Sequence, residues 1–169
     1  MNTKQLDCID RKNRWLHDLV EVEFPTKESL EGRKLYFQRL EQLTYQEVDP
    51  DLLAKQELIL SVDDIFRVDF HRLTVMYAIL QSHHWVETRE QELIVEYLSQ
   101  IILTSDIDLY VGFKEGEPVG AAMICQDEET LLISDVITTN NLPLSQFVGD
   151  LIRKITSNKK LNKTVILES

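Results

Sequence analysis

The sequence predicts an α+β fold in a single domain, with a helical N-terminal half (residues 1–104) packed on a small, mainly antiparallel sheet (residues 105–169). Apolar residues recur at helical spacing through the first half of the 169-residue chain. Near Ser105 this spacing gives way to short β-rich runs. Four of the five glycines also lie beyond that point, at Gly112, Gly116, Gly120 and Gly149. The hydrophobic content of 43% is ordinary for a globular protein.

Helical spacing predicts five helices before residue 104. The first covers residues 2–22, and Thr26 is expected to cap the second. Asp49-Pro50 is typical of a helix start and begins a short third helix that reaches about Leu60. Residues 61–64 resemble a capping box, so the fourth helix is expected to run from there to about Leu80. It is apolar around more than one face, which predicts the most buried helix. Residues 88–91 offer another capping box, and the apolar stripe of the fifth helix continues to residue 102.

The second half predicts the order β-β-β-α-β. Two β-rich runs, 109–113 and 119–125, are joined by a turn-forming segment at 114–118. A third strand, Thr130–Thr138, follows a turn at 127–129, and the three strands together predict an antiparallel meander. Beyond a loop at 139–143, a helix is expected over 144–155, then a polar turn at 159–163 and a last strand at 164–167.

The charge balance excludes two classes of partner. The chain has 29 acidic and 18 basic residues, a net charge of −11 and a pI near 4.8. Nucleic acids and anionic membranes need clustered Lys and Arg, so neither is an expected partner. An acidic surface suits either simple solubility or a basic partner or small cationic substrate. With no signal-like apolar segment and no run of about 18 apolar residues, the expected location is the cytoplasm.

Few residues have the spacing of a metal or nucleophile site. The two cysteines, Cys8 and Cys125, are too few for a structural zinc site or a disulfide scaffold, and Cys125 is expected to be a small buried hydrophobe in a strand. His17 and Glu21 lie four residues apart, and His84 is followed by Glu87 and Glu90, spacings that metal ligands also use. Acids are abundant here, so such neighbours arise by chance and no metal is predicted.

Asp135 is the polar residue that the pattern singles out. It interrupts an apolar strand, and a period of two places it on one face with Leu131, Ile133 and Ile137. Two interpretations stay open. The carboxylate lies at a sheet edge, or it lines a pocket in which its pKa would rise and it could act as a base.

The C-terminal part, about residues 105–169, resembles the GCN5-related N-acetyltransferases. The residues that carry the resemblance are EGEPVGAA (115–122) and LLISDVIT (131–138), followed in order by the helix 144–155 and the last strand. In that family a glycine-containing turn leads into a strand with Val-Gly and small residues. The next strand precedes the helix that holds the pyrophosphate of acetyl-CoA.

The resemblance implies an acyl-CoA-dependent N-acetyltransferase with acetyl-CoA as its cofactor and a small-molecule or protein amine as its substrate. Acetyl-CoA would lie beside the end of the third strand. The backbone groups expected to hold its pantetheine belong to Val136, Ile137 and Thr138. The amides expected to face its pyrophosphate belong to Leu144, Ser145 and Gln146. No catalytic residue is assigned by the resemblance.

The loop before the predicted helix departs from the family pattern. The family places an Arg/Gln-x-x-Gly-x-Gly/Ala motif there, because glycines let backbone N–H groups approach the pyrophosphate. Residues 138–146 read TTNNLPLSQ, and no Lys or Arg occurs from Glu115 through Ile152. The sequence therefore supports two hypotheses: an acetyltransferase-like protein, active or degenerate, and a non-enzymatic protein-binding or regulatory module with an acidic surface, for which a homodimer is expected.

Overall fold

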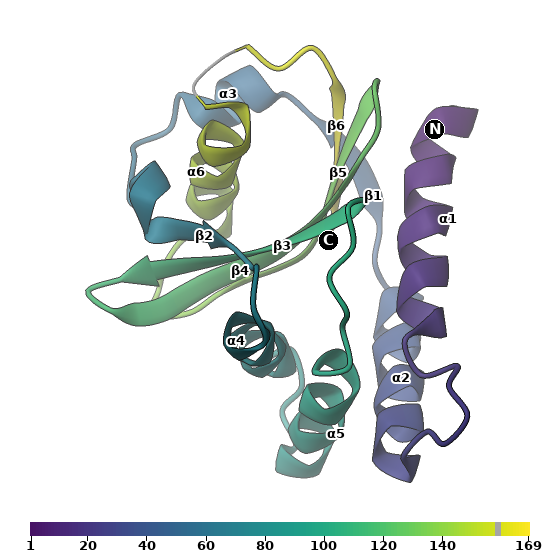
Figure 1. Cartoon of the computed structure of the whole chain (residues 1–169). Coiled ribbons are helices and arrows are strands. Elements are labelled where there is room, and N and C mark those ends of the chain that lie inside the picture. The colour runs from purple at the N-terminus through teal and green to yellow at the C-terminus, as the bar shows by residue number, and fades with distance from the viewer. Residues whose placement is uncertain (158–159) are drawn as a thin grey trace.

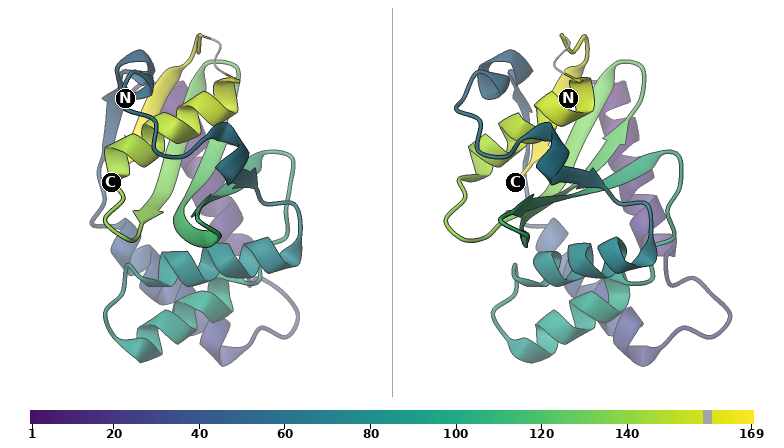
Figure 2. Two further views of the ribbon diagram at one scale, coloured as in Figure 1. Left: turned by 90° about the vertical axis from the view of Figure 1, so that its left-hand side faces the viewer. Right: turned by 60° about the vertical axis from the view of Figure 1, so that its left-hand side comes forward.

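The computed structural model describes residues 1–157 and 160–169 and contains one mixed sheet with helices on both faces (Figure 1). One face carries α6, with α3 beside it, and the other carries α1, α2, α4 and α5 (Figures 1 and 2). The described helices are α1 (Thr3–Asp18), α2 (Lys27–Leu40), α3 (Pro50–Ala54), α4 (His71–Ser82), α5 (Thr88–Leu98) and α6 (Leu144–Thr156). The coarse prediction of an α+β fold is confirmed.

The sheet contains strands from both halves of the sequence, in the order β1-β6-β5-β4-β3-β2. The strands are β1 (Tyr45–Val48), β2 (Ile65–Arg67), β3 (Ile107–Lys114), β4 (Glu117–Gln126), β5 (Thr130–Thr138) and β6 (Thr164–Glu168). The predicted antiparallel meander is formed by β3, β4 and β5. After the crossover through α6, β6 pairs parallel to β5 and antiparallel to β1. Residue 159, the start of the predicted polar turn, lies outside the described residues.

Several predicted helix starts are confirmed, and their caps are formed. The Thr26 hydroxyl accepts the backbone N–H of Ser29 at 3.1 Å at the start of α2. Asp49 caps α3 by accepting the N–H groups of Asp51 and Leu52 at 2.9 and 3.2 Å. Local signals of this kind need no tertiary partner, which is why the sequence alone reveals them.

The segment from residue 49 to residue 70 differs from its prediction. The third helix ends at Ala54 rather than near Leu60. Residues 61–80 do not form one helix, because a 3₁₀ turn (Val62–Asp64) and β2 come first. Pairing with β3 extends this stretch, with Phe66 opposite Val111. The cap predicted at Thr88 is also wrong, since Glu87 occupies the N-cap position and Thr88 is the first helical residue.

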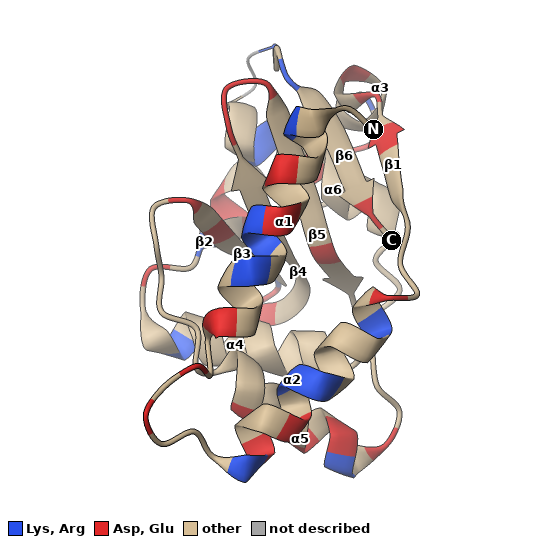
Figure 3. Ribbon diagram, turned by 90° about the vertical axis from the view of Figure 1, so that its right-hand side faces the viewer, with Lys and Arg blue, Asp and Glu red and all other residues tan. Residues whose placement is uncertain are grey.

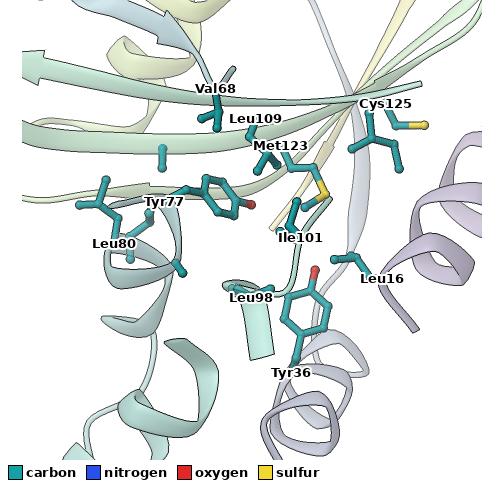
Figure 4. Close-up of a cluster of buried hydrophobic side chains, with 14 of the residues drawn as sticks. Leu16, Tyr36, Val68, Tyr77, Leu80, Leu98, Ile101, Leu109, Met123 and Cys125 are labelled. Atoms are coloured by element: carbon teal, nitrogen blue, oxygen red, sulfur yellow. The ribbon is translucent and has the colours of Figure 1, made fainter. Parts of the chain in front are cut away.

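The sheet separates two hydrophobic cores. The larger lies between the sheet and α1, α2, α4 and α5, and includes Tyr77, Leu109 and Met123 (Figure 4). The smaller lies beneath α6 and is centred on Phe147. A Cβ atom at Gly120 would lie 2.8 Å from the Phe147 ring, so glycine is required for α6 to pack this closely. No described helix is both long enough and apolar enough to cross a membrane.

Candidate functional site

The two parallel strands of the sheet pair only over a short distance. β5 and β6 are neighbours from the pair Thr130–Thr164 to the pair Ile133–Leu167. β5 then continues beside β4 for residues 134–138, whereas β6 ends at Glu168. Over these five residues the edge of β5 that faces away from β4 has no strand partner. We call this opening between residues 134–138 and the end of β6 the fork.

A β-bulge at Asp135 sets the shape of the fork. Ser134 pairs with Met123 and Ile137 with Ala121, so two residues of β5 oppose one residue of β4. Asp135 has φ +51°, a left-handed conformation that Asp adopts more readily than most residues. Its neighbour Val136 packs in the core beneath α6.

The bulge changes which face of the sheet Asp135 occupies. Leu131 and Ile133 pack beneath α6, whereas the Asp135 carboxylate contacts tyrosines of α2 and α4 on the opposite face. The shared face predicted for these residues is therefore wrong. Asp135 lies where β5 has lost its β6 neighbour, but it is only 2% exposed, so its carboxylate lies inside the protein rather than at a solvent-facing sheet edge.

The Asp135 side chain accepts two tyrosine hydroxyls. Tyr36 and Tyr77 donate to Oδ2 at 2.8 and 3.3 Å, and Gln81 donates to the backbone carbonyl of Asp135 at 2.5 Å. Burial raises the pKa of both tyrosines well above its usual value, and the Asp135 charge adds to this effect. Both hydroxyls therefore remain donors. Asp135 Oδ1 has no partner among the described residues, although a buried unpaired acceptor costs about 1–3 kcal/mol.

A buried ion pair lies next to this carboxylate. Lys12 of α1 pairs with Glu168 at the end of β6, and neither side chain is exposed. Oε1 of Glu168 has no partner among the described residues. Burial raises the pKa of Tyr45, and so does the nearby Glu168 carboxylate. The buried polar cluster thus comprises Lys12, Tyr36, Tyr77, Asp135 and Glu168, with the half-buried Tyr45 beside it. With two carboxylates and one ammonium, it has an excess of one negative charge when all three are ionised.

The sequence did not reveal the other members of the buried polar cluster around Asp135. Lys12 and Glu168, for example, are far apart in the chain and meet only through the tertiary fold. One local signal was available, because Lys12 lies four residues from both Cys8 and Leu16, which are buried on the same stripe of α1. A charged residue on an apolar stripe indicates a buried partner.

The six residues predicted to contact a cofactor fall into two groups at the fork. Val136 and Ile137 are each 6% exposed, so both are buried residues of β5. Thr138 ends β5, and its partner across the strand pair is Gly120. The loop that follows turns through Asn140 and Asn141, both with positive φ, and reaches α6 at Leu144.

The first turn of α6 lacks a side-chain cap. Pro143 is its N-cap residue and forms no side-chain hydrogen bond to the helix. Leu144 is 41% exposed and Ser145 is also exposed, whereas Gln146 is half-buried and its Oε1 has no partner within residues 1–157 and 160–169. The N–H groups of a helix's first turn have no partner within the helix. They are suited to an anion or a carbonyl oxygen.

The two cationic side chains of α6, Arg153 and Lys154, contact the segment 50–64. Arg153 donates to the backbone oxygen of Ala54 and pairs with Asp150 at 2.5 Å. Lys154 donates to the Val62 oxygen at 2.7 Å. Both therefore hold the segment 50–64, which crosses α6, and the basic residues in Figure 3 are prominent on α1 and α2. The first turn of α6 therefore presents backbone amides without an accompanying Lys or Arg side chain.

The other candidate residues lie apart from the fork. Glu21 pairs with Arg33 at 2.5 Å rather than meeting His17 at a common site. Within residues 1–157 and 160–169, no group of three or more His, Cys, Asp or Glu side chains is placed to hold a metal ion. Cys125 is fully buried as predicted, and burial raises its thiol pKa. Cys8 is also free and buried, with its pKa raised to about 12 by burial and by its hydrogen bond to Asp127.

Comparisons with known proteins give a fold relative without an activity. No protein-family model matches the sequence, and no curated protein matches it. Among solved structures, the chain is similar to a functionally unknown conserved protein from Staphylococcus epidermidis ATCC 12228, with a TM-score of 0.54 and 12% identity. The match covers 80% of this chain and 56% of that protein, so this chain spans little more than half of its length. At this identity the likeness concerns the fold alone.

Proposed function

We propose that this protein is an acyl-CoA-dependent N-acetyltransferase-like protein that holds acetyl-CoA at the fork. The observation that carries the proposal is the separation of β5 from β6 after Ile133, at a bulge, with α6 beginning a short loop later. Such an opening leaves strand backbone groups without a strand partner, a short loop before the N-terminus of a helix. An extended ligand with amides at one end and phosphates at the other is complementary to both features.

The backbone would make most of the cofactor contacts. Val136, Ile137 and Thr138 would hydrogen-bond the pantetheine along the open edge of β5. The N–H groups of Leu144, Ser145 and Gln146 would face the pyrophosphate, with the helix dipole worth about 0.3–1 kcal/mol. Bound acetyl-CoA supplies the activated acyl group as a thioester. Weak phosphate binding is the expected consequence of a first turn without Lys or Arg.

Asp135 is the residue that we propose as the base. Its buried Oδ1 has no donor among the residues that the structure describes, so an amine at the fork could donate to it and lose its proton there. Tyr36 and Tyr77 hold the other carboxylate oxygen and would keep Oδ1 oriented. The excess negative charge of the buried polar cluster favours a cationic amine substrate, whether a small molecule or a protein side chain.

Thermal unfolding with acetyl-CoA, CoA and pantetheine tests this proposal. A ligand at about 100 times its dissociation constant adds about 2.7 kcal/mol of stability. We expect stabilisation by all three, with pantetheine retaining much of the effect because the phosphates add little. Absence of any shift at millimolar acetyl-CoA would refute cofactor binding.

A pair of proline variants makes the test specific to α6. Leu144→Pro removes one N–H at the first helical position, where proline is tolerated, and Pro143 already has the extended backbone that must precede it. Thr88→Pro is the matched control at the first position of α5, after an extended Glu87. Leu144→Pro should weaken acetyl-CoA binding, whereas Thr88→Pro should leave it unchanged.

A second candidate function is a non-enzymatic protein-binding or regulatory module that forms a homodimer. The absence of Lys and Arg from Glu115 through Ile152 favours it, because a nucleotide would meet seven acidic residues in that stretch. A solution mass of twice the chain mass together with no response to acetyl-CoA would select this function. Stabilisation by acetyl-CoA would exclude it as the sole function.

A further inference from the structure

A pocket lies where the C-terminal ends of α2 and α4 meet α5. Its volume is about 460 Å³, within the range of small-molecule sites. The lining side chains that matter here are Leu35, Arg39, Leu43, His84, Trp85 and Glu90. The pocket is one helical turn beyond Tyr36 on α2 and beyond Gln81 on α4, both of which contact Asp135. It is therefore adjacent to the buried polar cluster.

Arg39 brings an unneutralised guanidinium to this pocket. It forms no ion pair with any carboxylate of the described residues, in a chain with 29 acids and 18 bases. Four other arginines do form such pairs: Arg33, Arg67, Arg89 and Arg153. A position in the last turn of α2 suits a cation, but it leaves most of the five guanidinium donors unused.

The neighbours of Arg39 fix its orientation without neutralising it. A guanidinium nitrogen lies 3.2 Å from Nδ1 of His84, and the guanidinium lies 5.9 Å from the centre of the Trp85 ring. Burial, and then the Arg39 charge, lower the pKa of His84 to about 4, so the imidazole is a neutral acceptor at pH 7. Gln91 donates to the Trp85 carbonyl at 2.8 Å, which ties this wall to α5.

The pocket also contains a carboxylate, that of Glu90 on α5, which has no ion-pair partner among the described residues. The Trp85 ring and the apolar side chains of Leu35 and Leu43 line the same cavity as the two charges. A guanidinium is suited to a carboxylate, a carboxylate to an ammonium, and the ring to a flat apolar group.

We propose that this pocket binds a free α-amino acid with an apolar side chain, its carboxylate on Arg39 and its ammonium towards Glu90. The proposal does not depend on the fork or on acetyl-CoA. Each charge of the ligand meets a side chain that the fold leaves without a counterion. The ligand's side chain would lie against Trp85, between Leu35 and Leu43.

Nuclear magnetic resonance on the full chain tests the proposal with three probes: phenylalanine, phenylacetate and phenethylamine. The chain has two tryptophans, so two indole N–H signals are expected, and a Trp15→Phe variant assigns them. Phenylalanine at millimolar concentration should shift the Trp85 signal saturably and leave that of Trp15, on α1, in place. Phenylacetate should bind more weakly, because it lacks the ammonium. A Trp85 signal that none of the probes moves would overturn the proposal.

Two charge variants separate the two halves of the site. Arg39→Gln should weaken phenylalanine and phenylacetate by about tenfold or more, the usual cost of losing a charge-assisted hydrogen bond. Glu90→Gln, a nearly isosteric change, should weaken phenylalanine and leave phenylacetate unchanged. Arg89→Gln, on an exposed arginine of the same helix, is the control that should change neither. Phenylalanine affinity unchanged in both Arg39→Gln and Glu90→Gln would refute the proposal even if Arg39→Gln lowered stability.

Discussion

Replacing Lys12 by Met isolates the energetic role of the buried ion pair. Lys12 and Glu168 have fully buried side chains, so the variant leaves a carboxylate in the core without its counterion. Breaking one side of such a pair costs about 3–5 kcal/mol, a large part of the usual stability of a domain. Met has nearly the length of Lys, so little of the cost comes from a cavity.

Two companion variants complete a double-mutant cycle for the Lys12–Glu168 pair. Glu168→Leu alone should also destabilise, because it leaves the Lys12 ammonium unpaired. Lys12→Met combined with Glu168→Leu should recover most of the loss, since an apolar pair of similar volume is often as stable as a buried ion pair. The control is Lys4→Met, because Lys4 lies on the same helix as Lys12 but pairs with Glu129 at the exposed surface. This variant should leave stability nearly unchanged.

Urea unfolding at pH 7 gives the free energy of each variant, with the slope checked for constancy. A loss for Lys12→Met as small as that for Lys4→Met would refute the burial of the pair. A double variant whose loss equals the sum of the two single losses would refute the direct contact, because independent sites add.

Asp135, Gly120 and His84 each give a further testable prediction. Asp135→Asn should leave the fold intact, since Asn also tolerates positive φ. The variant should slow any amine acetylation by about 10²–10⁴-fold. An unchanged turnover would exclude Asp135 as the base. Gly120→Ala should cost about 1–3 kcal/mol in urea unfolding through its clash with Phe147, and an unchanged midpoint would contradict that packing. His84 has a lower pKa folded, about 4, than unfolded, about 6.5. The unfolded chain therefore takes up the proton first as pH falls between these values, and stability falls in that window by up to about 3 kcal/mol, a loss that His84→Gln should reduce.

The C-terminal elements could be predicted from sequence because their patterns are local. The strand Thr130–Thr138 has the bounds that its β-rich run predicts, and α6 begins at the predicted Leu144. The prediction failed at residues 61–70, where Ile65, Phe66 and Phe70 fit a helical stripe as well as a strand. Pairing of β2 with β3 decides between the two, and a pairing partner over 40 residues away is invisible to a local pattern.

The site was predictable only in part for a related reason. Sequence periodicity placed Asp135 beside Ile133 on one face, but the bulge adds a residue and reverses the alternation. The contacts of Asp135 with Tyr36 and Tyr77 depend on where α2 and α4 dock. By contrast, the six backbone positions around the loop 139–143 were assigned from the family resemblance, and their contact with a cofactor stays a prediction.

Hydrogen exchange with and without acetyl-CoA tests the central claim most directly. The backbone amides of residues 136–138 and 144–146 are the proposed cofactor contacts, and their exchange reports on binding at those positions. The account predicts that acetyl-CoA slows exchange in peptides spanning these residues and leaves α5 unchanged. Exchange that stays the same across 134–146 at millimolar acetyl-CoA, or that slows only elsewhere, would contradict cofactor binding at the fork.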